Sequence, residues 1–195
     1  MAKEQPRDEF PLSQKKVIKG TRHLAREKVF QILVATLDGD VSLDVVFPHV
    51  FYRQFTFDPA EATAQRILKP DEVRELEADV PIDWNDVDIE YARTVLMAER
   101  DLRDEVTKRI EQMVTNWDFE RIANLDIILM RLAYVELIAC PDIPIKVTLN
   151  ETIELAKRFS TDKSGTFING VLDAIIDGLN KEGRIRKTGR ARLNG

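Results

Sequence analysis

The sequence predicts an all-α fold, and three observations lead to that prediction. Apolar residues recur every three or four positions over much of the chain, which is the spacing of a helix that buries one face. No pair of alternating runs joined by a tight-turn dipeptide indicates a β-hairpin. The longest apolar runs are a few residues, against the roughly 20 that a membrane-spanning helix needs. We therefore expect a bundle of amphipathic helices.

The N-terminal part contains one clear helix and one element that stays open. A helix is predicted from Thr21, as its N-cap, to about Leu37. Residues 42–57 are rich in β-branched and aromatic side chains, so propensity allows a strand there. Ser42 as a cap and Pro48 inside the run leave the choice between strand and helix undecided.

A proline-containing connector precedes the clearest helix of the chain. Residues 58–88 hold three prolines among many charges, and we expect one or two short helices there. A long helix is predicted from about residue 89 to residue 114, because its apolar residues recur at helical spacing with charged residues between them. Asp118 then suits the cap of a short segment.

The last three helices follow from an apolar run, a proline and a polar turn. Residues 124–139 are apolar on nearly every side, so this helix belongs at the centre of the bundle. Pro144 is well placed to start a helix that ends near Phe159. A polar turn at residues 160–165 precedes the final helix, with Thr166 as its expected cap.

The net charge of −5 conceals an uneven distribution. Residues 1–28 hold eight basic and four acidic side chains, and residues 181–195 hold six basic and one acidic. The middle of the chain is strongly acidic, with a net charge of −14. Basic ends suit phosphate binding, but charged ends are also commonly solvated and disordered. Charge alone does not decide between these two interpretations.

The residues for most catalytic and metal chemistry are scarce. One Cys and two His exclude an internal disulfide and give little support to a zinc site. Dinucleotide, phosphate-loop and zinc-protease motifs do not occur. We expect no metal, no cofactor and no enzymatic activity. The N-terminus has no apolar signal core, so we expect a cytoplasmic protein.

The segment 149–174 carries the most specific pattern in the sequence. It reads LNETIELAKRFSTDKSGTFINGVLDA and resembles the C-terminal signature of the NusB family of bacterial transcription antitermination factors. Two shorter stretches, residues 25–27 and 129–137, are similar to the same family, and the resemblance covers about residues 20–50 and 86–180. The matching positions of the signature are Asn150, Glu151, Glu154, Leu155, Ala156, Lys157, Phe159, Phe167, Asn169, Gly170, Val171, Leu172 and Asp173.

The resemblance implies a NusB-like bundle of two three-helix subdomains over residues 20–180, with a lineage-specific connector inserted at residues 52–86. Residues 1–19 are then a basic leader, expected to be disordered, and residues 181–195 a basic tail. The family is not enzymatic. Its members bind the boxA single-stranded RNA of nascent ribosomal RNA transcripts together with NusE, a small-subunit ribosomal protein, in the transcription elongation complex. Some relatives form a homodimer when they are free of RNA.

The first group of expected RNA-binding residues lies at the start of the first helix. Arg22 and Arg26 are four residues apart, so both can offer guanidinium groups to phosphates on one face. The alternative is an ordinary exposed basic face or, for Arg26, an internal ion pair with Glu27 or another carboxylate. His23 suits either a surface position or an RNA contact.

The second group surrounds the polar turn before the last helix. Phe167 is expected in the first helical turn beside Lys157 and Lys163, and single-stranded RNA recognition uses exposed rings flanked by cations. Phe159 belongs to the same group, and core packing is the alternative for both rings. Asn169 suits either an RNA contact or a local hydrogen bond.

Two structural expectations accompany these groups. The family fold implies that Arg22 and Phe167 lie near each other, which would join both groups in one surface. Gly170 is expected to permit close approach of a neighbouring helix.

Two other functions were weighed against RNA binding. The first is a helical protein-interaction module, whose acidic middle docks a basic ribosomal protein without RNA specificity of its own. The second is an enzyme, since NusB-like domains also occur in certain ribosomal RNA cytosine methyltransferases. Those enzymes carry a separate cofactor-binding domain, for which this chain has no room.

Overall fold

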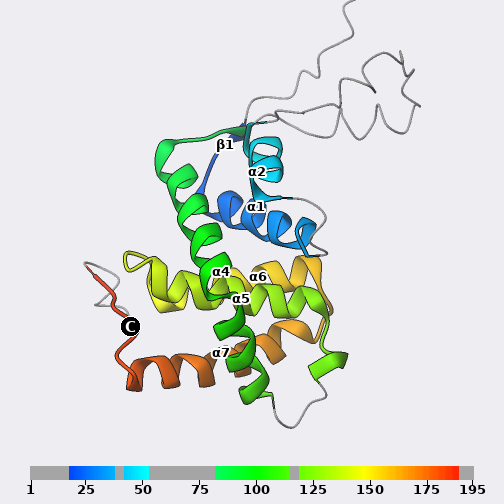
Figure 1. The fold of residues 1–195 in the computed structure, drawn as a ribbon, viewed down its shortest axis with the longest axis vertical. Coiled ribbons are helices and arrows are strands. Elements are labelled where there is room, and N and C mark those ends of the chain that lie inside the picture. Colours follow the sequence, from blue (N-terminus) through cyan, green and yellow to red (C-terminus); the bar gives the residue numbers. More distant parts are fainter. Residues whose placement is uncertain (1–17, 38–41, 53–81, 115–118, 189–195) are drawn as a thin grey trace, which may run out of the picture.

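The computed structural model describes residues 18–37, 42–52, 82–114 and 119–188, which form a helical bundle (Figure 1). The central helix is α5, which contacts α1, α4, α6 and α7. The all-α prediction is confirmed, because the only strands among the described residues are two-residue segments. The elements in chain order are β1 (Ile18–Lys19), α1 (Arg22–Ala35), α2 (Leu43–Tyr52), β2 (Ile82–Asp83), α4 (Asp86–Met113), the short 3₁₀ helix η1 (Phe119–Arg121), α5 (Asn124–Ala139), α6 (Ile145–Phe159) and α7 (Ser164–Lys181).

The described helices fall into two groups of three. Helix α1 packs against α2 and α4, while α5, α6 and α7 pack against one another. The long helix α4 runs from the first group across α5 and reaches α7 (Figure 1). This arrangement agrees with the predicted pair of three-helix subdomains. The core is continuous between them, because α5 is buried on nearly every side as its composition predicted.

Helix α2 settles the element that propensity left open. Residues Leu43–Tyr52 are helical, with Pro48 inside the helix, so the strand interpretation was wrong. Tertiary packing explains the outcome: Phe47 and Phe51, four residues apart, stack at 4.6 Å between ring centroids, and Phe51 lies 4.9 Å from the ring of Trp84. One helical face thus buries the aromatic residues together, which outweighs β-propensity.

The other predicted boundaries hold with small shifts. The limits of α5 and α6 are those predicted, and Thr21 caps α1 by accepting a hydrogen bond from the backbone N–H of Leu24 at 3.2 Å. Helix α4 begins three residues early, because the Asn85 side chain caps it at the N–H of Asp88, 2.8 Å away. Helix α7 already begins at Ser164, so Thr166 is not its cap.

A two-residue parallel pairing, which was not predicted, joins the starts of α1 and α4. Ile18 pairs with Ile82 and Lys19 with Asp83. The chain then passes Gly20, whose N–H donates to the Asp83 carbonyl at 2.7 Å. A Cβ at Gly20 would lie 2.5 Å from the indole of Trp84, so the close approach requires glycine. The pairing places the first turn of α1 beside the first turn of α4.

The segment after α7 folds back onto the bundle. Gly183 has φ +66°, a left-handed conformation that ends the helix, and the N–H of Arg184 donates to the Leu179 carbonyl at 2.9 Å. Arg184 then pairs with Glu105, and Lys187 donates to the Cys140 carbonyl at 3.0 Å. Arg184, Ile185 and Lys187 are therefore partly buried, so this part of the basic tail packs on the bundle and is not fully solvated.

Several predictions fall on residues that the structure does not describe. These are the disordered leader up to residue 17, the cap at Asp118 and most of the connector between residues 53 and 81. The tail beyond residue 188 is likewise outside the described residues.

Candidate functional site

Arg22 lies in the first turn of α1 and is partly engaged with α4. Its Nε donates to Oδ1 of Asp88 at 2.9 Å, and its guanidinium carbon lies 4.4 Å from the centre of the Tyr91 ring. The side chain remains 29% exposed. Arg22 is therefore oriented by a carboxylate and an aromatic face while part of its guanidinium group remains accessible.

Arg26, the second arginine of the predicted pair, is buried. It is only 2% exposed, its Nε donates to Oε2 of Glu136 at 2.7 Å, and its Nη1 pairs with Oε2 of Glu151 at 3.0 Å. The prediction that Arg26 contacts RNA is wrong for this structure. The alternative interpretation, an internal ion pair with a carboxylate, describes its position.

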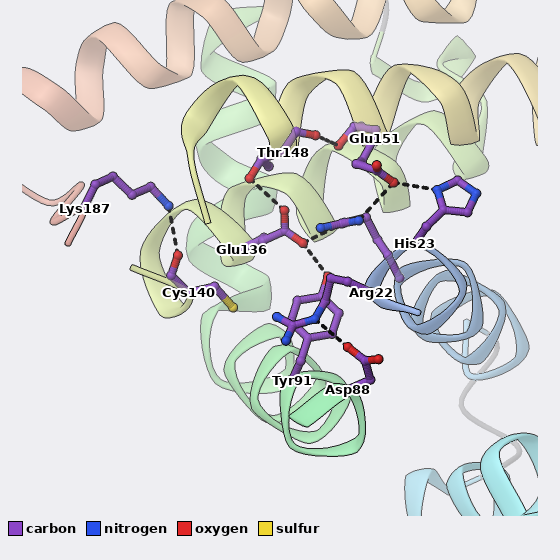
Figure 2. Close-up of polar contacts among 11 residues, drawn as sticks. Arg22, His23, Asp88, Tyr91, Glu136, Cys140, Thr148, Glu151 and Lys187 are labelled. Carbon is purple, nitrogen blue, oxygen red and sulfur yellow. Dashed lines mark hydrogen bonds and ion pairs between the residues drawn. The ribbon is translucent and has the colours of Figure 1, made fainter. Parts of the chain in front are cut away.

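Arg26 belongs to a buried group with Tyr91, Glu136 and Thr148, which we call the buried cluster. Figure 2 labels the last three of these residues. Four different helices contribute to it. The Glu136 carboxylate accepts hydrogen bonds from Arg26, from the Tyr91 hydroxyl and, at 2.7 Å, from Thr148 Oγ1. Burial opposes the charge of Arg26, but Glu136 and other neighbours outweigh it and raise the pKa of the guanidinium group. Burial, followed by the Glu136 charge, raises the pKa of Tyr91 as well.

The buried cluster was missed by sequence reasoning. Glu136 lies in a helix that is otherwise almost entirely apolar, which is a signal that a polar partner must be buried beside it. The partners of Glu136 lie in three other helices, so its position in the sequence does not identify them. The arrangement pairs the buried charges of Arg26 and Glu136, although Nη2 of Arg26 has no hydrogen-bond partner, and we assign it a structural role.

His23 is the exposed neighbour of the buried cluster. Its Nδ1 lies 2.6 Å from Oε2 of Glu151, the carboxylate that also pairs with Arg26 (Figure 2). The imidazole side chain is 47% exposed. Glu151 therefore connects an accessible histidine with a buried arginine.

The second predicted group lies around a groove between α6 and α7. The groove has a volume of about 320 Å³ and is lined by Ile153, Lys157, Asp162, Gly165, Thr166 and Asn169. Lys157 and Lys163 are exposed, and Lys157 pairs with Glu154 at 2.6 Å. Asn169 donates to Oδ2 of Asp173 at 2.9 Å, so its carboxamide is held one turn along α7. Two of the predicted residues, Lys157 and Asn169, thus line the same groove, and the exposed Lys163 follows the lining residue Asp162 in the chain.

The two predicted rings are half-buried and pack against the core. Phe159 lies 5.3 Å from Phe30 between ring centroids, and Arg158 covers its ring at 5.1 Å. Core packing therefore describes Phe159. Phe167 shares the edge of the core but keeps part of its ring accessible.

The helix approach expected at Gly170 occurs at a different glycine. A Cβ on Gly170 would meet nothing within 4 Å, whereas one on Gly165 would lie 3.5 Å from Ile153 Cγ2. The expectation for Gly170 was therefore wrong. Gly165 faces α6 at the groove, where a Cβ would make an ordinary van der Waals contact.

The two predicted groups lie at different positions along α6. Helices α1 and α6 run in the same direction, since His23 contacts Glu151 while Phe30, further along α1, contacts Phe159. Lys157 lies six residues beyond Glu151, about 9 Å along the helix axis. The groups therefore form two patches offset along α6, and the expected proximity of Arg22 and Phe167 stays a prediction.

Other kinds of site are not present in the described part of the chain. No group of three or more His, Cys, Asp or Glu side chains there could hold a metal ion. No described helix is long and apolar enough to cross a membrane. The single cysteine, Cys140, is buried, and burial raises the pKa of its thiol to about 12, so it is not a reactive thiolate.

Comparisons with known proteins converge on one family. The model of the NusB family matches residues 51–177. The transcription antitermination protein NusB of Salinibacter ruber is 41% identical over 111 residues, which are 57% of this chain and 69% of that protein. A T. maritima NusB structure superposes with a TM-score of 0.60 at 26% identity, covering 82% of this chain and 93% of the other.

A second solved structure is similar in fold. It is a crystal structure of the antitermination factors NusB and NusE in complex with double-stranded RNA, with a TM-score of 0.57 at 21% identity. The match covers 80% of this chain and 96% of the other. At this identity the likeness shows the fold alone.

Proposed function

The chain belongs to the NusB family, and from this premise we propose that it acts as a transcription antitermination factor that binds boxA-type single-stranded RNA of nascent transcripts together with NusE. Its role is binding, without enzymatic activity of its own. The observation that carries the proposal for this chain is the groove between α6 and α7, where Lys157 and Asn169 lie together. Family membership indicates the class of RNA, and the groove indicates where on this chain the RNA binds.

The groove has the chemistry that single-stranded RNA needs. Lys157 and Lys163 supply mobile ammonium groups for phosphates, and the N-terminus of the 18-residue helix α7 adds a partial positive charge. Asn169 and the hydroxyl of Thr166 can bond to a base edge or a ribose. The accessible part of the Phe167 ring offers a stacking surface. RNA binding is therefore centred on the α6 and α7 edge.

Arg22 and His23 form the second part of the proposed RNA surface. Arg22 is oriented by Asp88 and Tyr91, so its guanidinium group reaches a phosphate with little loss of conformational freedom. Because the two patches are separated along α6, one nucleotide does not touch both. A strand of several nucleotides is required to contact them together.

The proposed NusE contact has its own supporting feature. A groove of about 560 Å³ beside Arg22 is bordered by the exposed carboxylates of Asp86, Glu90 and Asp142 and by the exposed side chain of Val87. Its acidic rim suits a basic ribosomal protein. The same groove favours the second candidate function, a protein-interaction module that docks such a partner without RNA specificity of its own.

We extend the proposal to the setting in which the protein works. It acts in the cytoplasm as part of the transcription elongation complex, and the RNA-free protein forms a homodimer. Light scattering with and without RNA measures the mass of the free and bound protein. A constant monomer mass in both conditions contradicts the homodimer.

A titration separates the two candidate functions. Fluorescence anisotropy with a labelled boxA-like RNA and with a scrambled RNA of equal length, at physiological salt, should give tighter binding to the boxA-like strand. Equal affinities would sink the RNA proposal. The matched variants are Lys157→Gln with Lys163→Gln for the RNA groove, and Glu90→Gln with Asp142→Asn for the acidic groove.

Each pair of variants should affect one partner. The lysine variant should weaken RNA binding and leave NusE binding unchanged, and the carboxylate variant should do the reverse. If the lysine variant keeps full RNA affinity while the protein still binds NusE, the interaction-module function replaces the first proposal.

A further inference from the structure

A cluster of hydroxyl groups ties the turn between α6 and α7 to the start of α5. We call this turn, residues 160–163, the α6–α7 turn. The two carboxylate oxygens of Asp126 accept separate hydrogen bonds, from Ser160 Oγ at 2.5 Å and from Ser164 Oγ at 2.8 Å. The acceptor belongs to a helix that precedes the turn by more than thirty residues. The turn is therefore held by tertiary contacts as well as by its own backbone.

Ser164 extends the cluster into the turn itself. Because its hydroxyl donates to Asp126, it accepts from its other neighbours. The Thr161 hydroxyl lies 2.8 Å from Ser164 Oγ, and the Thr161 backbone N–H donates to the same oxygen at 3.3 Å. A single carboxylate thus fixes Ser160, Thr161 and Ser164, which bracket Asp162 and Lys163 on both sides.

The residues that hold the turn are buried, whereas the residues between them are exposed. Asp126 is 6% exposed and Ser164 is 2% exposed, whereas Asp162 and Lys163 are exposed. A buried carboxylate that loses its donors pays a desolvation penalty, so the cluster strongly favours the one turn geometry that satisfies it. The cluster therefore also fixes the backbone at Asp162 and Lys163, although neither residue is hydrogen-bonded to Asp126.

We propose that Asp126 is a positioning residue for RNA binding, which acts by holding the α6–α7 turn in the conformation that presents Lys163 and the groove beside Asn169. This inference rests on the proposed RNA-binding function of the groove. Asp126 itself is buried beneath the turn and does not contact the RNA. Its effect is on the fraction of molecules whose turn is ready to bind.

The main test compares two replacements of Asp126. Asp126→Ala removes both acceptor oxygens. Asp126→Asn keeps one acceptor oxygen and supplies an NH2 group that can donate a hydrogen bond to a serine hydroxyl. If the turn of the alanine variant is competent a tenth of the time, its apparent Kd for boxA-like RNA rises about tenfold. The asparagine variant should recover most of that loss. Equal Kd values for wild type and Asp126→Ala would overturn the proposal.

A matched control separates positioning from general stability. Val106 is fully buried in α4, away from the hydroxyl cluster, so Val106→Ala lowers the melting temperature without touching the turn. RNA affinity of this variant, measured well below its melting temperature, should equal that of the wild type. If Val106→Ala weakens RNA binding as much as Asp126→Ala at an equal loss of melting temperature, Asp126 is merely structural.

Hydrogen exchange supplies a readout that does not depend on RNA. Amides of residues 160–168 should exchange faster in Asp126→Ala than in the wild type, while amides of α4 keep their protection. Ser164→Ala should raise the apparent Kd similarly, and the double variant should be no worse than either single one, because both remove the same unit. If the losses of RNA affinity add up in the double variant, Asp126 and Ser164 do not act as one unit.

The outcomes distinguish this inference from the function on which it rests. If wild type does not prefer boxA-like RNA, the proposed function fails, whatever Asp126 does. If wild type binds and Asp126→Ala binds equally well with a faster-exchanging turn, the function stands and the positioning role is refuted.

Discussion

The buried cluster and the α6–α7 turn use charged residues in opposite ways. In the buried cluster, Arg26 and Glu136 are both at most 2% exposed, and each charge is neutralised by a partner. At the α6–α7 turn the carboxylate of Asp126 is buried and neutral donors hold it, which leaves the exposed Lys163 available at the surface. Arg26 and Lys163 therefore differ in what the fold leaves exposed: Arg26 is enclosed with Glu136, whereas Lys163 lies at the surface.

The two arginines of α1 also differ in their exposure, although they lie in one helix. Arg22 and Arg26 are one turn apart, yet Arg22 keeps 29% of its side chain exposed and Arg26 almost none. Since ion pairs at surfaces contribute little and broken buried pairs cost much, their replacement should have very different effects.

The largest effect is expected for Arg26→Ala. It leaves Glu136 buried without its main counter-charge, so the free energy of unfolding should fall by about 3–5 kcal/mol. Arg22→Ala, the matched comparison, should lose less stability, because Arg22 is 29% exposed and its partner Asp88 keeps a hydrogen bond from the Asn85 side chain. Urea unfolding followed by circular dichroism measures both. An Arg26→Ala protein with wild-type stability and lost RNA binding would reverse our assignment of Arg26.

The next effect concerns the aromatic ring at the groove. Phe167→Leu keeps most of the apolar volume that packs against the core but removes the stacking surface, so RNA binding should weaken by about 1–3 kcal/mol with a small change in unfolding free energy. Phe159→Leu is the control, because that ring packs against Phe30. Equal RNA affinities of the Phe167→Leu variant and the wild type would assign this ring to the core alone.

The lysines of the groove should change the salt dependence of binding. Replacing Lys157 or Lys163 by Gln removes one phosphate contact, so the slope of log Kd against log salt should fall by about 0.7 for a single strand. Stability should stay the same, because both side chains are exposed. Lys146→Gln, another exposed lysine at the opposite end of α6, controls for general charge and should alter the slope less.

The smallest effect is expected for the tail contact. The hydrogen bond from Arg184 lowers the pKa of Glu105 below its ordinary value of 4.5. A carboxyl group with a lowered pKa in the folded state stabilises it above pH about 4.5, and this contribution disappears as the pH falls through the folded-state pKa. The side chain of Glu105 is 41% exposed, so we expect less than about 1 kcal/mol. Unfolding of Glu105→Gln and wild type should differ at pH 7 and converge near pH 3.

Much of the architecture was predictable because it depends on local patterns. The apolar periodicity gave the correct limits of α5 and α6, and Thr21 caps α1 as its side chain suggested. The strand interpretation of the segment at Pro48 failed because propensity does not include the stacking of Phe47 on Phe51. Lys157 and Asn169 belong to the matched signature, and both line the groove.

By itself, the sequence determined the helical class, the NusB family and the identity of the cationic residues, since these depend on composition, spacing and a specific motif. Only the tertiary structure decided which charges are available to a ligand. Glu136 reaches Arg26 across 110 positions, and Asp126 reaches Ser164 across 38. The physical reason is that desolvation and pairing depend on neighbours in space, and no local pattern in a single chain reports them.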